Sequence, residues 1–470
     1  MDFIRMTACT VLDELEAGRV SPLELLDALE ARIRDVDGDV NALPTLCFER
    51  AREHGQRLME LPRDERGLLC GLPVPIKDLV EVAGVRTTHG SRIFADHVPE
   101  HSGFVVEQLE REGGLVYAKS NTPEFGAGAN TFNDVHGTTH NPWDVTKSAA
   151  GSSGGAAAAL ATGMAWVAHG SDMGGSLRNP ASFCGVVGLR PAPGRVAKGP
   201  GVNPYGTLSV EGPMARTIED TALFLDAMTN WERRDPRSLA KPGRTFRSYA
   251  QSRSLPKKVA FSRDLGITPV EPEVGDLCER AAKRFEDLGV PVEEAHPDFS
   301  GAHDTFQTLR ALEFAVSHGE LLAAHRDKFK PELIWNVEKG LALTSEEIVV
   351  AMRTRGELVK RAAAFFDDYD VLLCPATIVA PYPLEQRYVE SCNGEKFESY
   401  IDWLAVAYAI TLMSHPALSL PCGFTQTGLP VGLQMVGCAR GEGALLSAAA
   451  ALEEALGLDH EPIDPRGRVG

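Results

Sequence analysis

Two glycine-serine tracts, separated by an alanine-rich segment, constrain this chain more than any other feature. The first tract spans residues 151–155 (GSSGG) and the second spans residues 170–178 (GSDMGGSLR). Glycine beside serine allows a backbone to approach a ligand closely and to turn its N–H groups toward it, which acyl-transfer chemistry requires of an active-site loop. A single tract of this kind is more typical of a plain turn. A functional interpretation therefore depends on finding a base that accompanies the serines.

Lys77 is a candidate for that base. It lies in residues 71–80 (GLPVPIKDLV), an apolar segment stiffened by prolines. Burial disfavours the charged ammonium and lowers the pKa of a lysine from about 10.4 toward neutrality, where the free amine accepts protons. The alternative is a surface lysine that pairs with Asp78 or Glu81. The segment alone leaves both interpretations open.

A different nucleophile pattern is weaker. Ser153 lies in a Gly-x-Ser-x-Gly match, which as a nucleophile elbow predicts a strand before the serine, a helix after it, and an acid and a histidine downstream. Residues 142–150 (PWDVTKSAA) make a poor strand. The elbow is therefore a minor alternative.

We expect no cofactor. Two histidine pairs, at positions 97/101 and 136/140, have the i, i+4 spacing of helical zinc ligands, but Pro99 and Gly137 between them oppose a helix. A phosphate-cradling Gly-x-x-x-x-Gly-Lys loop is also lacking. The sequence thus predicts a reaction that uses neither a metal nor a nucleotide.

Composition narrows the class of partner. Of 470 residues, 43% are hydrophobic and 24% are charged, which is typical of a folded globular protein. The net charge of −18 would repel nucleic acid and anionic membranes, so we expect a small-molecule substrate. Nine scattered cysteines without a Cys-x-x-Cys pair favour reduced thiols. No signal peptide or membrane-spanning run is evident, and together these features predict a cytoplasmic protein.

Strand and helix patterns mix along the whole chain. A capping box at residues 21–24 (SPLE), with proline at the first helical position, predicts the start of a helix. Apolar runs at 371–379, 416–424 and 431–437 predict buried strands, and residues 442–456 predict a helix closed by Gly457. Further helical patterns cover 103–112, 154–162, 272–288 and 345–366, and a strand is expected at 257–262. Without a repeat or a clear linker, the sequence predicts one large α/β domain.

The ordered set of motifs strongly resembles the amidase signature family, over nearly the whole chain. The resemblance rests on the Lys77 segment and both tracts, together with NTPE at 121–124, NPW at 141–143, PA at 180–181, FCGVVGL at 183–189, EGPMAR at 211–216 and GLPVGLQ at 428–434. It implies a central twisted mixed β-sheet covered by helices on both faces, in a single domain spanning 1–470. The signature core would occupy about 65–220 and the variable substrate-pocket region about 300–405.

The resemblance also implies roles for the serines and the lysine. Ser176 would be the nucleophile, Ser152 the bridging serine and Lys77 the base, which gives a Ser–Ser–Lys proton relay without histidine. A cis peptide bond would hold the bridging serine, and backbone N–H groups of the second tract would form an oxyanion hole. The implied oxyanion and substrate-binding residues are Met173, Gly174, Gly175 and Gly126, and those implied to support the loops are Ser153, Asp172 and Arg178.

Two positions depart from the family's usual pattern. Ala150 stands where the first tract commonly has another glycine, and Met173 stands where a threonine commonly precedes Gly174. Because the oxyanion donors are backbone groups, Met173 is compatible with activity. We expect it to reshape the pocket wall instead.

The resemblance implies an amidohydrolase that cleaves a carboxylic amide to an acid and ammonia or an amine, with ester hydrolysis chemically open. The region from about 300 to 405 offers aromatic residues that hint at an apolar or aromatic acyl group, although each one alone is more typical of a protein core: Phe306, Phe314, Trp335, Tyr382, Phe397, Tyr400 and Trp403. The main alternative is the glutaminase subunit of a tRNA-dependent amidotransferase, but residues 335–340 (WNVEKG) lack its Arg-Arg pair and residues 400–404 (YIDWL) lack its Asp-Pro-Leu-x-Met-Tyr pattern. A second alternative is a non-catalytic scaffold of the same fold. The identity of the amide and a homodimeric state stay open.

Overall fold

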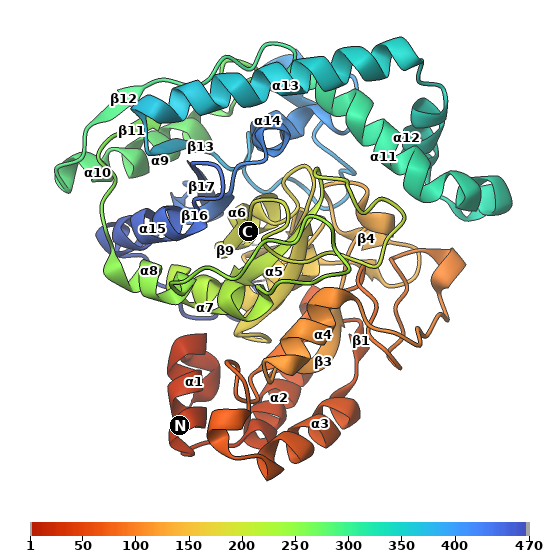
Figure 1. Cartoon of the computed structure of the whole chain (residues 1–470), viewed down its shortest axis with the longest axis vertical. Helices are drawn as coiled ribbons and strands as arrows, with labels where there is room; N and C mark the ends of the chain where they lie inside the picture. The colour runs from red at the N-terminus through yellow and green to blue at the C-terminus, as the bar shows by residue number, and fades with distance from the viewer. Residues whose placement is uncertain (1, 467–470) are drawn as a thin grey trace.

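An eight-stranded mixed β-sheet forms the centre of the protein (Figure 1). The computed structural model describes residues 2–466. Its main sheet has the order β12-β11-β13-β17-β16-β9-β10-β8, in which the first two pairs are parallel and every later pair is antiparallel. The strands are β8 (Val167–Asp172), β9 (Val187–Arg190), β10 (Val210–Ala215), β11 (Val259–Phe261), β12 (Val292–Glu294), β13 (Val371–Pro375), β16 (Ala417–Phe424) and β17 (Pro430–Gly437).

A three-stranded sheet of order β1-β3-β2 adjoins the main sheet. It consists of β1 (Thr45–Leu46), β2 (Pro73–Lys77) and β3 (Leu115–Ser120), and β2 packs beside the edge strand β8. Three two-stranded ribbons complete the strands: β4 (Phe132–Asn133) with β5 (Gly137–Thr138), β6 (His140–Asn141) with β7 (Asp144–Ser148), and β14 (Ser391–Cys392) with β15 (Glu395–Lys396). The β2–β8 contact places the end of β2 next to the second glycine-serine tract.

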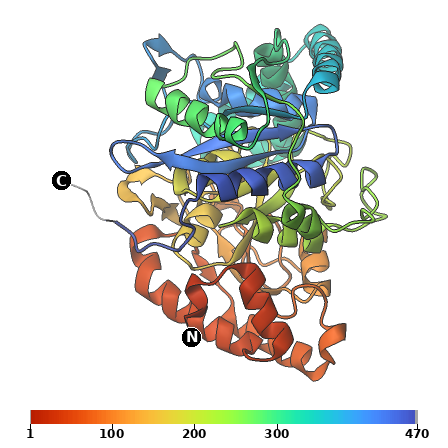
Figure 2. The same cartoon turned by 90° about the vertical axis from the view of Figure 1, so that its left-hand side faces the viewer.

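Helices surround these sheets. The N-terminal helices α1–α3 gather at one end of the molecule and α11–α13 at the other (Figures 1 and 2). The helices are α1 (Ala8–Ala17), α2 (Pro22–Val40), α3 (Phe48–Glu60), α4 (Phe104–Arg111), α5 (Gly154–Ala161), α6 (Arg178–Cys184), α7 (Ile218–Met228), α8 (Phe246–Ser252), α9 (Pro272–Ala282), α10 (Arg284–Asp287), α11 (Ala302–His325), α12 (Pro331–Leu341), α13 (Ser345–Asp368), α14 (Ala405–Met413) and α15 (Glu442–Leu456).

Both faces of the main sheet are covered, as expected. On β17 the side chain of Gln434 hydrogen-bonds Arg178 of α6 and the carbonyl of Val406 in α14. Three residues later, a Cβ at Gly437 would point at Leu445 of α15, and strand positions of opposite parity face opposite sides. Helix α15 therefore covers one face, where Figure 2 shows it against the strands, and α6 with α14 covers the other.

The capping signals mark the predicted helix ends correctly. The Ser21 side chain accepts the N–H of Glu24 and the Glu24 carboxylate accepts the N–H of Ser21, so the capping box starts α2. Gly457 closes α15 with a φ of 59°, a left-handed conformation that glycine adopts without steric cost. The three apolar runs near the C-terminus form β13, β16 and β17. The prediction of an α/β fold is confirmed.

One local expectation is wrong. Residues 142–150, expected to make a poor strand, contain β7. This strand pairs with β6 in a separate ribbon, outside the main sheet, and most of its side chains are partly exposed. Its polar residues are tolerated because a half-exposed ribbon does not require the apolar sequence of a buried strand.

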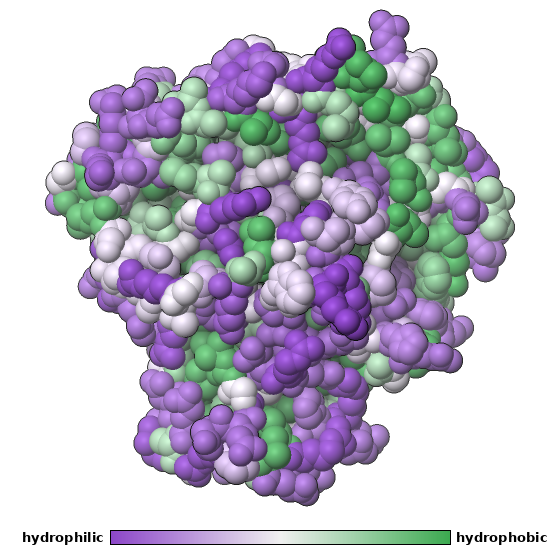
Figure 3. Space-filling view, viewed as in Figure 1, coloured by the Kyte–Doolittle hydropathy of each residue, from purple (hydrophilic) through white to green (hydrophobic). Residues whose placement is uncertain are grey.

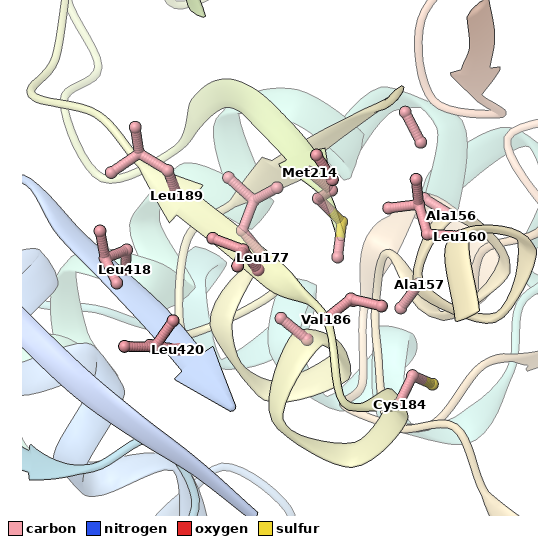
Figure 4. Packing of buried hydrophobic residues seen from close by; sticks show 14 of the residues in the cluster. Ala156, Ala157, Leu160, Leu177, Cys184, Val186, Leu189, Met214, Leu418 and Leu420 are labelled. Atoms are coloured by element: carbon pink, nitrogen blue, oxygen red, sulfur yellow. The ribbon is translucent and has the colours of Figure 1, made fainter. Parts of the chain in front are cut away.

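Small residues fix the first glycine-serine tract in the core (Figure 4). Every residue of α5 (GGAAAALA), which follows the tract, is buried. Figure 4 shows Ala156 and Leu160 of this helix in one cluster with Leu177 and Met214. A Cβ at Gly155 would lie only 2.3 Å from the backbone nitrogen of Asn121, so close packing requires glycine there.

Apolar side chains also gather on the outer surface of α11–α13 (Figure 3). Val316, Leu341, Val350 and Met352 are all more than half exposed. Among the described residues, no helix has both the length and the apolar character needed to cross a membrane. Helix α11, which carries part of this apolar surface, also contributes residues to the candidate active site described below.

Candidate active site

Lys77, the last residue of β2, is fully buried. Its Nζ lies 2.8 Å from the Oγ atoms of Ser152 and Ser153 and 3.0 Å from the Oγ of Ser171. The alternative of a surface lysine paired with Asp78 is wrong. The carboxylate of Asp78 instead lies 3.2 Å from the ammonium of Lys119.

The surroundings of Lys77 adapt it to accept a proton. Burial lowers its pKa from 10.5 to about 7, although the carboxylates of Glu211 and Asp172 act in the opposite direction. A second contact orients the backbone, because the Lys77 N–H donates to His169 Nδ1 (3.3 Å) while His169 Nε2 lies 3.0 Å from Glu211. With Nδ1 acting as acceptor, the neutral imidazole carries its proton on Nε2 and donates it to Glu211.

The first tract turns sharply where Ser152 meets Lys77. The Gly151–Ser152 peptide bond is cis, as the resemblance implies. Thr131 braces the turn, because its hydroxyl donates to the carbonyl of Ala150 (2.8 Å) and accepts the N–H of Gly154 (3.2 Å). Ala150 has a φ of +55°, a left-handed conformation that glycine adopts more readily.

The second tract leaves β8 and is held by its own aspartate. Asp172 accepts the backbone N–H groups of Gly175 and Leu177, each at 3.1 Å. Gly175 has a φ of +111°, and a Cβ there would lie 2.5 Å from the side-chain oxygen of Asn179. The Ser153 N–H donates to the Ser176 carbonyl (3.2 Å), which links the two tracts directly.

The backbone donors of the second tract divide into two groups. The N–H of Gly175 is used by Asp172, whereas within residues 2–466 the N–H groups of Met173, Gly174 and Ser176 donate to no protein acceptor. Three unused N–H donors within four residues of one loop are what a developing oxyanion requires. Gly175 is expected among the oxyanion residues, but in this structure its N–H already donates to Asp172. Its contribution here is therefore to the conformation of the loop.

A buried charge cluster supports this loop from behind. Asp172 binds Arg178 through two contacts of 2.8 and 3.0 Å and also contacts Arg190 at 3.3 Å. All three side chains are fully buried. Burial alone would raise the pKa of Asp172, but the two arginines hold it well below its ordinary value. The cluster is therefore a carboxylate with two guanidinium groups and carries one net positive charge.

The two tracts face a small cavity of about 80 Å³, which we call the inner cavity. Ser152 and Ser176 line it together, as do Gly126 and Gly174. A Cβ at Gly126 would lie 3.4 Å from Ser152 Oγ, so glycine keeps this wall close to the serine. The opposite wall is formed by Phe306, Arg310, Phe314, Tyr400 and Leu404.

A larger cavity of about 320 Å³, the outer cavity, adjoins the inner one and shares lining residues with it, among them Phe125, Ser171 and Met173. It extends to Val202 in the 198–206 loop, which is 72% exposed. Its charged lining residues are Lys198, Glu211, Arg237 and Glu313.

The structure brings together the residues expected from the sequence. Lys77, Ser152, Ser153, Ser176, Gly126 and the 172–178 loop all meet at the inner cavity or directly behind it. Ser153 is fully buried with its Oγ against Lys77, which disfavours its interpretation as a nucleophile elbow. Of the aromatic residues considered for the pocket, Phe306, Phe314 and Tyr400 line the inner cavity, whereas Trp335 is 39% exposed elsewhere.

Sequence reasoning missed several residues of the site. Ser171 and Glu211 lie within the motifs of the sequence analysis, but the motifs alone indicate no role for them. Thr131, His169 and Arg310 had no signal in the sequence, because their importance comes from contacts with distant segments.

Comparison with known proteins agrees with this geometry. The family described as Amidase matches residues 24–446. An acylamidase from Rhodococcus erythropolis is 33% identical over 95% of both chains. One subunit of the glutamyl-tRNA(Gln) amidotransferase from Moorella thermoacetica is 34% identical over 97% of both. The crystal structure of a bacterial aryl acylamidase of the amidase signature family superposes with a TM-score of 0.90 and 28% identity, covering 96% of each chain.

These matches extend over nearly the whole chain and include the segments that carry the two tracts and the buried lysine. The chain therefore belongs to the amidase signature family, and it is a hydrolase that acts on carboxylic amide C–N bonds.

Proposed function

We propose that this protein hydrolyses a small carboxylic amide through an acyl-enzyme on Ser176, with Ser152 and Lys77 as its proton relay. One observation carries the proposal. A fully buried lysine with a pKa of about 7 lies 2.8 Å from Ser152 Oγ, and Ser152 shares the inner cavity with Ser176. A base of this pKa is half neutral at physiological pH, which suits general base catalysis.

The three hydroxyls around Lys77 match the hydrogen-bonding capacity of a neutral amine. A neutral amine has two N–H donors and one lone pair. The N–H groups would donate to Ser153 and Ser171, and the lone pair would accept the O–H of Ser152. Ser152 is then able to accept a proton from Ser176 while it delivers its own to Lys77.

Attack on the amide follows from this arrangement. The Ser176 oxygen forms a bond to the amide carbonyl carbon as its proton passes to Ser152, and the Ser152 proton passes to Lys77. The unused N–H groups of the second tract stabilise the negative oxygen of the tetrahedral intermediate. The proton then returns through Ser152 to the nitrogen of the leaving group, and the C–N bond breaks. A water molecule then gives up a proton to the same relay as its oxygen attacks the acyl-enzyme, which releases the acid and regenerates Ser176.

We propose a stand-alone amidase over a glutaminase subunit. Relatives of both kinds are about equally similar to the chain, so the distinction depends on individual residues. Residues 335–340 and 400–404 lack the patterns typical of the glutaminase. Tyr400, in the second of these segments, instead hydrogen-bonds Arg310 at the wall of the inner cavity.

Labelling with a fluorophosphonate followed by peptide mass spectrometry tests the relay. We expect modification at Ser176, its loss in Ser176→Ala, and a strong decrease of the labelling rate in Lys77→Ala and Ser152→Ala. Ser153→Ala is the comparison variant: it removes one hydroxyl that orients the same lysine but no member of the relay, so we expect a smaller decrease than in Ser152→Ala. Modification at Ser153 would support a nucleophile elbow, and absence of labelling would support a non-catalytic scaffold.

Ammonia release from a panel of aliphatic, aromatic and amino-acid amides tests the stand-alone activity. We expect turnover by the isolated protein. Turnover of glutamine alone, stimulated by a partner protein, would contradict this part of the proposal. A cytoplasmic location and a homodimeric state stay predictions, to be checked by cell fractionation and by light scattering.

A further inference from the structure

We propose that the inner cavity binds an acyl group that ends in a carboxylate, and that Arg310 is the residue that recognises it. This inference rests on the proposed function and adds the substrate class. It assigns to the protein the half-amides of short dicarboxylic acids.

Arg310 reaches the inner cavity from α11 and is only 6% exposed. Its guanidinium donates to the hydroxyl of Tyr400 (2.7 Å) and to the side-chain oxygen of Asn336. Its Cζ lies 4.2 Å from the centroid of the Phe314 ring. All of these partners are uncharged.

Among residues 2–466, Arg310 forms no ion pair with a carboxylate. Within the described residues, no carboxylate oxygen lies within 4.0 Å of its guanidinium nitrogens. A guanidinium has five N–H donors, and two contacts leave about three of them for another acceptor. Removing a cation from water without a counter-ion is costly. A ligand carboxylate in the cavity would supply the missing partner.

The neighbouring charges increase the attraction for an anion. Lys330 is partly buried, and desolvation lowers its pKa to about 8; Glu332 and Glu124 act in the opposite direction, and Arg310 is among the cations that lower it further. The carboxylates of this region are occupied by other groups. Glu332 pairs with Arg387 at 2.7 Å, and Asp402 accepts hydrogen bonds from Gln307 and Ser399.

The positions of the two cavities indicate which part of the substrate meets Arg310. After the first step the amine must leave and water must enter while the acyl group stays on Ser176. The outer cavity extends to the exposed 198–206 loop and suits the leaving amine. The acyl group then occupies the inner cavity, whose volume of about 80 Å³ corresponds to roughly three water-sized groups. A short chain is therefore sufficient to reach from Ser176 to Arg310.

The guanidinium of Arg310 favours a ligand carboxylate over an uncharged hydrogen-bond acceptor. The planar guanidinium fork matches the two oxygens of a carboxylate, and such charge-assisted pairs are stronger than neutral hydrogen bonds. The other walls contribute Phe306, Phe314 and Leu404, which would pack against the methylene groups of the acyl chain.

A pair of isosteric substrates tests the inference. Succinamate carries the carboxylate, and 4-oxopentanamide has a methyl ketone in its place. We expect wild-type kcat/KM to favour succinamate by on the order of 100-fold, since a site built to bind a group discriminates strongly against an analogue without it. Arg310→Met should abolish this ratio and Arg310→Lys should retain part of it. Lys339→Met is the matched control, because it removes a nearby cation that does not line the inner cavity, and should leave the ratio unchanged.

A second measurement uses only the wild-type protein and is independent of how the variants fold. We expect succinate to protect Ser176 from fluorophosphonate labelling at concentrations at which butyrate does not. Equal protection by the two acids, equal kcat/KM for the two amides, or survival of the ratio in Arg310→Met would overturn the inference. If Ser176 is labelled but shows no preference for carboxylates, only this inference fails; if Ser176 is not labelled at all, the proposed function fails.

Discussion

Replacing Lys77 with methionine tests the protonation state on which the proposed relay depends. In the folded protein the pKa of Lys77 is about 7, whereas its ordinary value is 10.5. Between these two pH values the unfolded chain carries a proton at this lysine that the folded protein lacks. The free energy of unfolding of the wild type must then rise with pH in this window, relative to a variant that cannot titrate.

The size of the effect follows from the two pKa values. Each pH unit between about 7 and 10.5 adds about 1.4 kcal/mol to the free energy of unfolding of the wild type relative to Lys77→Met. From pH 7.5 to pH 9.5 this amounts to about 2.7 kcal/mol. A chain of 470 residues has an unfolding entropy of about 1 kcal/mol/K. The difference between the Tm values of the wild type and Lys77→Met should therefore change by about 3 °C over this pH range.

Calorimetry at several pH values measures the difference in Tm between the wild type and Lys77→Met. The contributions of the other titrating groups cancel in this difference because both proteins contain them. The same pKa should appear in the kinetics of the wild type, with kcat/KM falling about tenfold per unit below pH 7 because Lys77 becomes protonated. A pH-independent difference in Tm, together with the absence of an acid limb between pH 6 and pH 8, would refute a lysine that is neutral in the folded protein.

Three further predictions concern the surroundings of the relay. Gly175→Ala should lower kcat on the order of 100-fold, measured by steady-state kinetics, because its Cβ would collide with Asn179 and displace the loop. Asp172→Asn should lower the free energy of unfolding by about 3–5 kcal/mol, measured with denaturant, because it leaves two buried arginines without their counter-ion. Glu211→Gln should move the acid limb of kcat/KM to lower pH, because Glu211 raises the pKa of Lys77. A wild-type value in any of these measurements would contradict the role assigned to that residue.

The residues of the proposed relay could be identified from the sequence because each lies in a short motif of unusual composition. Lys77 lies between prolines and apolar residues, and Ser152 and Ser176 lie among glycines that allow close backbone contacts. The expectation that these three residues lie close together came from the family resemblance and not from their spacing in the sequence. Whether Lys77 was buried could not be decided locally, since its burial comes from β8 and from the serine tracts, far along the chain.

The wall of the inner cavity could not be predicted, for a physical reason. Helix α11 buries Thr305, Phe306 and Gln307 consecutively, so its apolar residues do not form the single stripe that identifies an amphipathic helix. The effect of the Glu211 carboxylate on the pKa of Lys77 could not be predicted either. It depends on the register of β10 against β8, in which Glu211 lies opposite Ser171.

The inner cavity is assembled from two parts of the chain that are far apart in sequence. The lysine and both serines lie within residues 77–176, whereas the opposite wall comes from α11 and residues 400–404. This separation makes the protein a modular starting point for directed evolution. A library that varies positions 306, 310, 314 and 400 would sample new acyl specificities while every atom of the proposed proton relay stays unaltered. The apparent rate of fluorophosphonate labelling would then identify library members that keep the relay intact.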